Sequence, residues 1–313
     1  MVKGNTKNII NGWINLDKDK DLTSTQALGR LKRILNVKKA GHAGTLDPLA
    51  TGCLPVALGE CTKVIQFAQN KAKIYEFEVT WGQSRTTDDL EGEVLEQSEL
   101  RPELSDIENC LPRYCGKILQ TPPQFAAVKI NGKRAYEIAR AGEKADIEPR
   151  EVCVNSFKII NHDKNVTRFQ VQCGKGVYIR SLARDLGNDL TCYGFISELR
   201  RLSVGPFDEK TMITLDNLEE IVHSDELQTA LYPPETMLDD IPALDLTEQE
   251  TARLKQGQKL GLYSKPQLDR LEKAGIRVDP ENQVNAYARY NGRIMALIKV
   301  KGVEVKPARI LNL

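Results

Sequence analysis

Residues 41–63 read G-H-A-G-T-L-D-P-L-A-T-G-C-L-P-V-A-L-G-E-C-T-K, and they decide how the rest of the chain is interpreted. Four glycines and two prolines punctuate this stretch, so its backbone is expected to turn tightly or to approach another segment closely. The order G-x-x-x-x-G-K-[ST] of a phosphate loop is missing, and so is the dinucleotide pattern G-x-G-x-x-G. On composition alone, Asp47 before a proline would be a turn former or a helix cap.

Outside this stretch, the clearest pattern is the alternation over residues 73–81. Tyr75, Phe77, Val79 and Trp81 share one face, which predicts a strand with an apolar inner side. Further strands are expected at 9–16, near 125–131, and at 151–160 and 166–173. Helices are expected from about Thr25, capped by Thr23 or Ser24, around 104–111 and 134–141, and at 177–190. Strands and helices alternate irregularly, which favours an α+β fold with a mixed sheet over a doubly wound nucleotide fold.

A domain boundary is expected in the proline-rich stretch 232–242. Beyond it, strand-like runs at 283–290 and 294–300 are joined by Asn291-Gly292, a strong hairpin signal. We therefore expect a catalytic domain over residues 1–242 and a small β-rich domain over residues 243–313.

Composition limits the class of protein without defining it. The 313 residues carry a net charge of only +1, so an RNA-binding surface would require charges to be segregated on the folded molecule. No apolar run is long enough to span a membrane, and Met1–Asn5 lack the apolar core of a signal peptide, which together predict a cytoplasmic protein. Seven cysteines without a C-x-x-C pair argue against zinc ribbons and disulfide frameworks, and buried reduced thiols are expected.

The order of residues in four places carries a resemblance. G-H-A-G-T-L-D-P-L-A-T-G-x-L-P resembles, position by position, the signature of the TruB family of tRNA pseudouridine synthases. Lys73-Ile74-Tyr75-Glu76 resembles the family's K-x-Y motif, Lys175–Arg180 its K-G-x-Y-I-R motif, and Leu199-Arg200-Arg201 its L-R-R. The resemblance extends from about residue 10 to 240. More loosely, Leu260 onward and Lys306–Arg309 look like a PUA domain, an RNA-binding β-barrel.

The resemblance implies a fold and a reaction. The fold is a pseudouridine-synthase sheet with flanking helices, a thumb insertion at about 118–150 and a PUA-like C-terminal domain. The reaction breaks the glycosidic bond of a uridine and rejoins the uracil through C5, which requires no cofactor and no metal. A carboxylate is needed for such glycosyl chemistry. The resemblance assigns it to Asp47, assigns the charge partner to Arg180, and places Tyr75 against the uracil ring, where it could handle the C5 proton.

Other residues are expected to contact the RNA. Tyr178 and Leu199 would enclose the base and exclude water. His42 would enter the RNA loop and stack in the space that flipped-out bases leave. The retained Lys18 is a further expected contact. Basic residues of the thumb insertion would meet the phosphates of the T-arm, namely Lys129, Lys133, Arg134 and Arg140. The expected substrate is the T-loop uridine at tRNA position 55, modified without a guide RNA by a monomeric protein.

The sequence departs from the family pattern in two places and leaves two alternative functions open. Asp17-Lys18-Asp19-Lys20-Asp21 stands where the family commonly has Asp-Lys-Pro-x-Gly, which puts the local turn in doubt. Arg85-Thr86-Thr87 replaces a common T-D-T, and the sequence assigns no role to Arg85. A tRNA-folding chaperone with secondary catalysis is the first alternative function. The second, a guide-dependent synthase for ribosomal RNA, is disfavoured by the thumb-like insertion.

Overall fold

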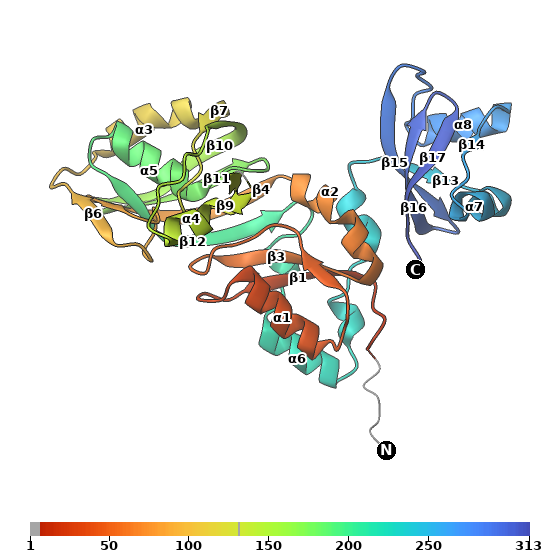
Figure 1. Cartoon of the computed structure of the whole chain (residues 1–313), viewed down its shortest axis with the longest axis horizontal. Coiled ribbons are helices and arrows are strands. Elements are labelled where there is room, and N and C mark those ends of the chain that lie inside the picture. Colours follow the sequence, from red (N-terminus) through yellow and green to blue (C-terminus); the bar gives the residue numbers. More distant parts are fainter. Residues whose placement is uncertain (1–6, 131) are drawn as a thin grey trace.

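A computed structural model describes residues 7–130 and 132–313 of the protein. The chain forms one long, curved sheet with helices on its faces and a separate C-terminal sheet beside one end of it (Figure 1). Met1–Asn5, on which the signal-peptide argument rests, lie outside the described residues. In the part that is described, no helix is both long and apolar enough to cross a membrane.

The large sheet has eight strands, and all neighbouring pairs but one are antiparallel. Its order is β1 (Gly12–Lys18), β3 (Thr51–Leu58), β12 (Gly194–Val204), β4 (Lys73–Trp81), β11 (Val166–Cys173), β10 (Arg150–Asp163) and β7 (Gly116–Gln120), with β2 (Ala40–His42) pairing beside β3. A short two-stranded sheet, β5 (Gln83–Arg85) and β6 (Val94–Gln97), extends from the end of β4. The α+β prediction is confirmed.

Strand β4 has the expected bounds, and its alternate residues are buried as predicted. Phe77 packs against Phe157 and Phe169 with ring centroids 5.8 and 5.5 Å apart, and Trp81 meets Phe169 edge-on. These aromatic contacts join β4, β10 and β11 into one rigid platform.

The sheet is narrowest between β3 and β12. These strands run parallel and pair only through Arg200 with Thr51 and Arg201 with Gly52. Gly52 has φ +96°, and a Cβ there would lie 2.3 Å from the carbonyl oxygen of Arg201, so only glycine permits this approach. The junction separates β1, β2 and β3 from the remaining strands.

Each part of the sheet has its own helices. Helices α1 (Ser24–Ile34) and α6 (Leu215–His223) lie side by side next to β1 and β3 (Figure 1). Thr23, one of the two expected caps, begins α1 and forms a capping box with Gln26. Helices α3 (Leu104–Cys110) and α5 (Ile179–Asp189) add Ile107 and Leu182 to the core on the other part. The short helix α2 (Ile65–Asn70) follows β3 through the 3₁₀ turn η1 (Gly59–Val64).

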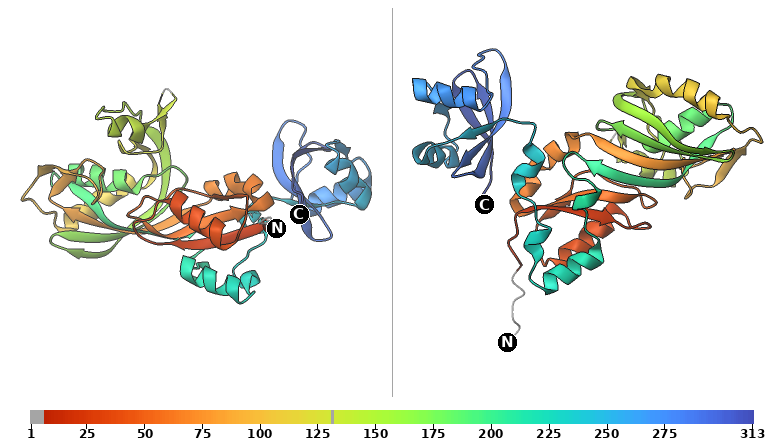
Figure 2. Two further views of the ribbon diagram at one scale, coloured as in Figure 1. Left: turned by 60° about the horizontal axis from the view of Figure 1, so that its bottom comes forward. Right: turned by 180° about the vertical axis from the view of Figure 1, so that it is seen from behind.

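Residues between β7 and β10 project from the body of the molecule (Figure 2, left). They contain the small hairpin of β8 (Lys129–Ile130) and β9 (Lys133–Arg134) and helix α4 (Ala135–Arg140). A small apolar cluster of Ala135, Ala145 and Ile147 holds the projection together. The expected strand at 125–131 is therefore largely wrong: only Lys129–Ile130 is extended, and residue 131 lies outside the described part.

The C-terminal sheet has five strands in the order β13 (Ala243–Asp245), β15 (Gln283–Tyr290), β16 (Arg293–Lys301), β17 (Glu304–Ile310) and β14 (Leu260–Gly261). Asn291 (φ 49°) and Gly292 (φ 76°) form the predicted hairpin turn between β15 and β16. Helices α7 (Glu248–Lys255) and α8 (Lys265–Lys273) cover this sheet, whose core includes Leu254 and Leu271.

The C-terminal sheet is joined to the rest by a shared apolar core. Ile294, Leu297 and Leu311 belong to one buried cluster with Trp13 and Val64. Polar contacts frame it: Lys63 Nζ donates to the Ile310 carbonyl at 2.7 Å, and the Asn312 amide donates to Glu60 at 2.9 Å. The linker carries the 3₁₀ turn η5 (Pro234–Leu238), where Glu235 accepts from the Ile294 amide at 2.8 Å.

Candidate active site

Asp47 lies in the connection between β2 and β3, and its neighbours fix the backbone there. The Ser24 hydroxyl both accepts from the Leu46 amide and donates to the Leu46 carbonyl, at 2.8 and 3.0 Å. The Ala50 amide bonds the Asp47 carbonyl at 3.1 Å, which closes a tight turn over Pro48. The glycine- and proline-rich stretch therefore turns as predicted around Asp47, but it continues into a strand from Thr51.

Lys18 supports this turn from beneath. Its side chain is fully buried, and its ammonium donates to the carbonyls of Asp19, Leu22 and Pro48. Burial lowers the pKa of Lys18 to about 8. In this position Lys18 holds the Asp47 turn and has no surface with which to meet RNA, which differs from the contact expected from the sequence.

Arg180 is the charge partner of Asp47. Its side chain is 6% exposed, and Nε lies 2.9 Å from Asp47 Oδ2. The Nε–H is not aligned for a hydrogen bond, so the contact is an ion pair. The two terminal nitrogens donate to the carbonyls of Thr87 and Phe125 at 2.9 and 3.2 Å, and Asp89 lies 3.6 Å away. These contacts hold the guanidinium in place beside the carboxylate.

A cleft of about 530 Å³ opens above this pair. Five of the expected site residues line it, namely Asp47, Tyr75, Tyr178, Arg180 and Leu199. They come from the β2–β3 connection, from β4, from the start of α5 and from β12, so the fold brings together residues far apart in the sequence. The cleft thus combines the Asp47–Arg180 ion pair with aromatic and apolar side chains.

Tyr75 forms part of the floor of the cleft. It is 9% exposed, and burial raises the pKa of its phenol, while the charge and a hydrogen bond of Arg201 oppose that rise. The phenol therefore stays protonated at neutral pH. Leu199, 8% exposed, closes the cleft beside it.

Tyr178 is positioned through its backbone. The Gln120 side chain donates to the Tyr178 carbonyl at 3.1 Å and accepts from its amide at 2.8 Å. Gln120 is 2% exposed at the end of β7. The strand that leads into the projecting segment is thus hydrogen-bonded to Tyr178, the residue that precedes α5 and lines the cleft.

His42 does not line the cleft. It ends β2, is half-buried, and burial lowers the pKa of its imidazole, with Arg201 acting in the same direction. Its Nδ1 is buried without a hydrogen-bond partner among the described residues. A neutral imidazole is suited to stacking and hydrogen bonding rather than to phosphate binding.

The sequence analysis did not predict two basic residues that line the cleft, although both belong to motifs that it identified. Lys73 in K-x-Y and Arg201 in L-R-R line the same cleft. Burial lowers the pKa of Lys73 to about 8, and its ammonium donates to the carbonyls of Gln69 and Lys71. The motif spacing was the available signal, because it places Lys73 on the same strand face as Tyr75.

The departures from the family pattern now have structural explanations. Asp21 adopts φ 63° where the pattern has glycine, and its amide bonds the Pro48 carbonyl, so the turn is kept. Arg85 stacks over Phe195 at 4.4 Å and donates to the carbonyls of Leu90 and Gly92. Arg85 therefore ties the 85–92 loop together.

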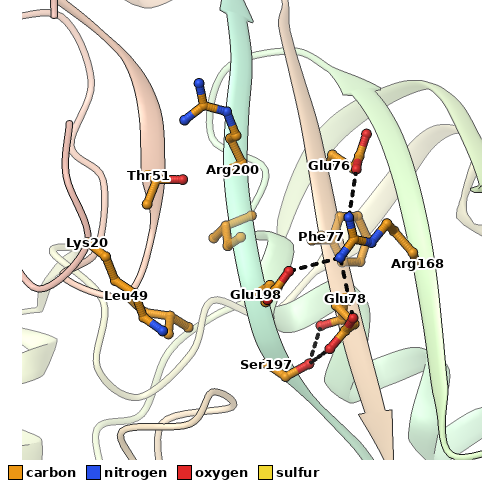
Figure 3. A pocket seen from close by; sticks show the side chains of 11 residues that line it. Lys20, Leu49, Thr51, Glu76, Phe77, Glu78, Arg168, Ser197, Glu198 and Arg200 are labelled. Atoms are coloured by element: carbon orange, nitrogen blue, oxygen red, sulfur yellow. Dashed lines mark hydrogen bonds and ion pairs between the residues drawn. The ribbon is translucent and has the colours of Figure 1, made fainter. Parts of the chain in front are cut away.

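A second cavity, of about 260 Å³, lies on the opposite face of the sheet (Figure 3). Arg168 there contacts Glu198, Glu76 and Glu78 at 2.9, 3.4 and 3.6 Å. The positive charge of Arg168 is paired with these carboxylates, and Asp47 does not line this cavity. We therefore assign the candidate active site to the larger cleft.

All seven cysteines are free, and five are buried, whereas Cys115 and Cys153 are exposed, so the expectation of buried thiols was wrong for these two. No group of three or more histidine, cysteine, aspartate or glutamate side chains in residues 7–130 and 132–313 could hold a metal ion.

Solved structures share this fold. A Cbf5–Nop10–Gar1 complex matches with a TM-score of 0.72 at 25% identity, covering 97% of this chain and 85% of the other. The archaeal box H/ACA Nop10–Cbf5 complex matches with a TM-score of 0.71 at 23% identity, covering 97% and 86%. The latter similarity concerns the fold alone.

Sequence comparisons define the class. Residues 32–179 match the N-terminal domain of TruB family pseudouridylate synthases, and residues 180–239 match the tRNA pseudouridylate synthase B C-terminal domain. A tRNA pseudouridine synthase B of Agrobacterium fabrum is 45% identical over 311 residues, 97% of this chain and 95% of the relative. A tRNA pseudouridine synthase B of Bradyrhizobium diazoefficiens is 46% identical over 310 residues, which cover 97% of this chain and 86% of the relative.

The fold and the sequence matches together define the protein as a pseudouridine synthase, which is an isomerase. The chain belongs to the TruB family. The family and the enzyme class expected from the four motifs are therefore confirmed.

Proposed function

We propose that the protein isomerises the T-loop uridine at position 55 of tRNA to pseudouridine, with Asp47 as the catalytic carboxylate. The ion pair between Asp47 and Arg180 carries the proposal: it holds a carboxylate 2.9 Å from a guanidinium inside a cleft that is also lined by Tyr75. The names of the relatives support tRNA as the substrate.

The chemistry follows from the positions of these groups. The uridine must leave its stack to reach a cleft of this depth, so base flipping precedes the reaction. Asp47 then either attacks the substrate or removes a sugar proton, and Arg180 balances its charge. Tyr75, Tyr178 and Leu199 enclose the detached uracil, which limits the access of water and keeps the base in place for rejoining.

The projecting segment is the proposed clamp on the T-arm. Lys129, Lys133, Arg134 and Arg140 are exposed on it, and Arg134 and Arg140 both lie over the Tyr136 ring, at 5.8 and 5.6 Å. Such side chains suit phosphates and unstacked bases. We further propose that residues 243–313 act as a PUA-like RNA-binding domain, and that a monomer works without guide RNA in the cytoplasm.

One experiment tests the assignment. Unmodified tRNA transcript is incubated with the wild-type protein and with Asp47→Asn, and pseudouridine is mapped. Wild type should modify the T-loop uridine, and Asp47→Asn should bind the tRNA with similar affinity but leave it unmodified. No product from wild type would disprove the proposed function, and product from Asp47→Asn would disprove the role of Asp47.

The same pair of proteins examines the folding role. If Asp47→Asn accelerates the refolding of a misfolded tRNA as well as wild type does, chaperone activity exists apart from catalysis. The clamp and the cleft are made by different segments, so such a separation is structurally possible.

A further inference from the structure

Arg201 occupies an unusual place for a cation. It lies on β12 at the narrow junction with β3, its residue is 1% exposed, and it lines the cleft. Its Nε donates to the Cys53 carbonyl at 2.6 Å, and its Nη2 donates to the Gly44 carbonyl at 3.1 Å. Burying a guanidinium among carbonyl groups costs free energy, so a role for the buried Arg201 side chain is expected.

These two bonds cross the junction. Cys53 is on β3, and Gly44 is in the connection that leads to Asp47. Arg201 belongs to the other part of the sheet, which also contains Tyr75 on β4 and packs against helix α5 with Arg180. Only two residue pairs join the strands here, so the backbone ladder alone resists little displacement between the parts. The Arg201 side chain extends the junction by two bonds toward the catalytic turn.

Arg201 also reaches Tyr75. Its guanidinium carbon lies 5.9 Å from the centre of the Tyr75 ring, and its charge opposes the rise that burial causes in the pKa of the Tyr75 phenol. One side chain therefore contacts the segment that carries Asp47 and the residue that faces the base.

We propose that Arg201 is a positioning residue that fixes the Asp47 turn relative to Tyr75 across the narrow junction of the sheet. This inference rests on the proposed function for its catalytic consequence, though not for its structural one. It does not require that Arg201 touch the RNA.

Arg200 provides a matched control, because it is the neighbouring residue and lines the second cavity instead of the cleft (Figure 3). It forms a two-pronged ion pair with Asp17, at 2.9 and 3.0 Å, and a contact with Glu209 at 3.0 Å. Arg200→Met removes an arginine with three polar contacts from the same strand without touching the cleft. Both arginines stand at the β3–β12 ladder, but Arg201 is buried and Arg200 is partly exposed, so the unfolding free energy of each variant is measured beside its rate.

The test measures single-turnover pseudouridine formation and tRNA affinity separately for Arg201→Lys, Arg201→Met and Arg200→Met. A displacement of reacting groups by about 1 Å costs on the order of 100-fold in rate, so we expect about a 100-fold loss for Arg201→Met and about a 10-fold loss for Arg201→Lys. The dissociation constant for tRNA should stay within about twofold, as should the rate of Arg200→Met. A loss confined to tRNA affinity, or equal rate losses for Arg200→Met and Arg201→Met, would overturn the proposal. If Arg201→Met does not fold, Arg201→Lys is judged by the same criteria.

Two further readouts separate positioning from stability. In a Tyr75→Phe background, Arg201→Lys should cost less than in wild type, and equal costs in both backgrounds would overturn the link to Tyr75. Amide hydrogen exchange of residues 43–50 should be faster in Arg201→Met than in Arg200→Met, and equal exchange would contradict the structural role. Because exchange does not depend on activity, an inactive wild type would disprove the proposed function and leave this readout decisive.

Discussion

At the scale of single residues, Asp21 shows how this chain keeps a turn that the family pattern builds with glycine. Its φ of 63° lies in the left-handed region, which side chains other than those of asparagine and aspartate seldom occupy. Its amide bonds Pro48 next to Asp47, so the strain is located directly under the catalytic turn.

Asp21→Gly should therefore stabilise the protein, by about 1 kcal/mol, because glycine adopts this backbone conformation without a steric penalty. Chemical denaturation measures the difference in unfolding free energy. Asp19→Gly, two residues earlier and without a positive φ, is the control and should not stabilise. A decrease in stability for Asp21→Gly would show that the Asp21 carboxylate contributes more than the turn geometry costs.

How much of the site was predictable also becomes clear at this scale. Asp47, Arg180 and Tyr75 could be assigned because ordered motifs carry them, and the structure brings all three to one cleft. Lys18 was expected to contact RNA because the family resemblance retains it, whereas the fold buries it on three carbonyls. Burial of this kind depends on tertiary contacts with the Pro48 turn.

At the scale of elements, helix α5 and the 85–92 loop form one unit behind the cleft. Arg184, one turn after Arg180, donates to Asp88 at 3.1 Å and to the Thr121 carbonyl at 2.9 Å. Burial raises the pKa of Asp88 to about 6, although Arg184 opposes that shift. The carboxylate of Asp88 therefore becomes an anion, able to pair fully with Arg184, only as the pH rises through about 6.

We expect the single-turnover rate of wild type to increase with pH through about 6, since ionised Asp88 holds the loop that positions Arg180. Folding favours the protonated form of Asp88 between its ordinary pKa and 6, so the stability contribution has the opposite sign and falls over that range. Asp88→Asn stays neutral and should lack the rise. An unchanged profile in Asp88→Asn would assign the rise to another group.

In the C-terminal sheet, Glu250 connects helices α7 and α8. Arg270 donates to both of its oxygens, at 2.8 and 2.6 Å, and the Thr247 amide donates at 2.9 Å. Burial alone would raise the pKa of Glu250, but these hydrogen bonds outweigh it and lower the pKa to about 2. The contribution to stability is therefore complete above the ordinary pKa of 4.5 and is lost as the pH falls through about 2.

Glu250→Gln should lower the unfolding free energy by about 1 kcal/mol at neutral pH, a value reduced for the partial exposure of the pair. The difference from wild type should shrink as the pH falls from 4.5 toward 2. Thermal melts of both proteins across that range measure it. A difference independent of pH would mean that packing, rather than the charge, is what the substitution removes.

Elements also explain what the sequence analysis missed. Strand β3 (Thr51–Leu58) was hidden because Gly52 and Pro55 look like turn residues, yet Gly52 meets Arg201 and Pro55 faces Asn15 in the ladder with β1. Strand β4 was found to the residue, because its alternation is local. Pairings between distant segments leave no periodic signal, and the position of Arg201 depends on one of them.

At the scale of the whole molecule, the two sheets share a core instead of being linked by a free tether. Leu311 is fully buried in the cluster that also holds Trp13 and Val64. Glu60 accepts from Lys63, Lys39 and the Asn312 amide, so the end of the chain is fastened to η1. The C-terminal domain is thereby oriented relative to β3 and, through it, to the Asp47 turn.

Leu311→Ala should cost about 2–4 kcal/mol of stability, because it leaves a cavity at this shared core. Loosened docking should also weaken the binding of full-length tRNA more than that of an isolated T-arm. Leu313→Ala, which truncates an exposed side chain, is the control. Equal affinity losses for the two RNAs would argue that the orientation of the C-terminal domain does not contribute to binding.

The narrow β3–β12 junction has a consequence for synthesis. When β1, β2 and β3 leave the ribosome, β2 can already pair with residues 56–58 of β3, but β12, which pairs with Thr51 and Gly52, has not been translated. During that interval the start of β3 has unpaired backbone groups on this edge, which are a site for pairing with other chains. Slowing translation between these segments should therefore lower the yield of the native protein, and a chaperone that shields extended segments should restore it.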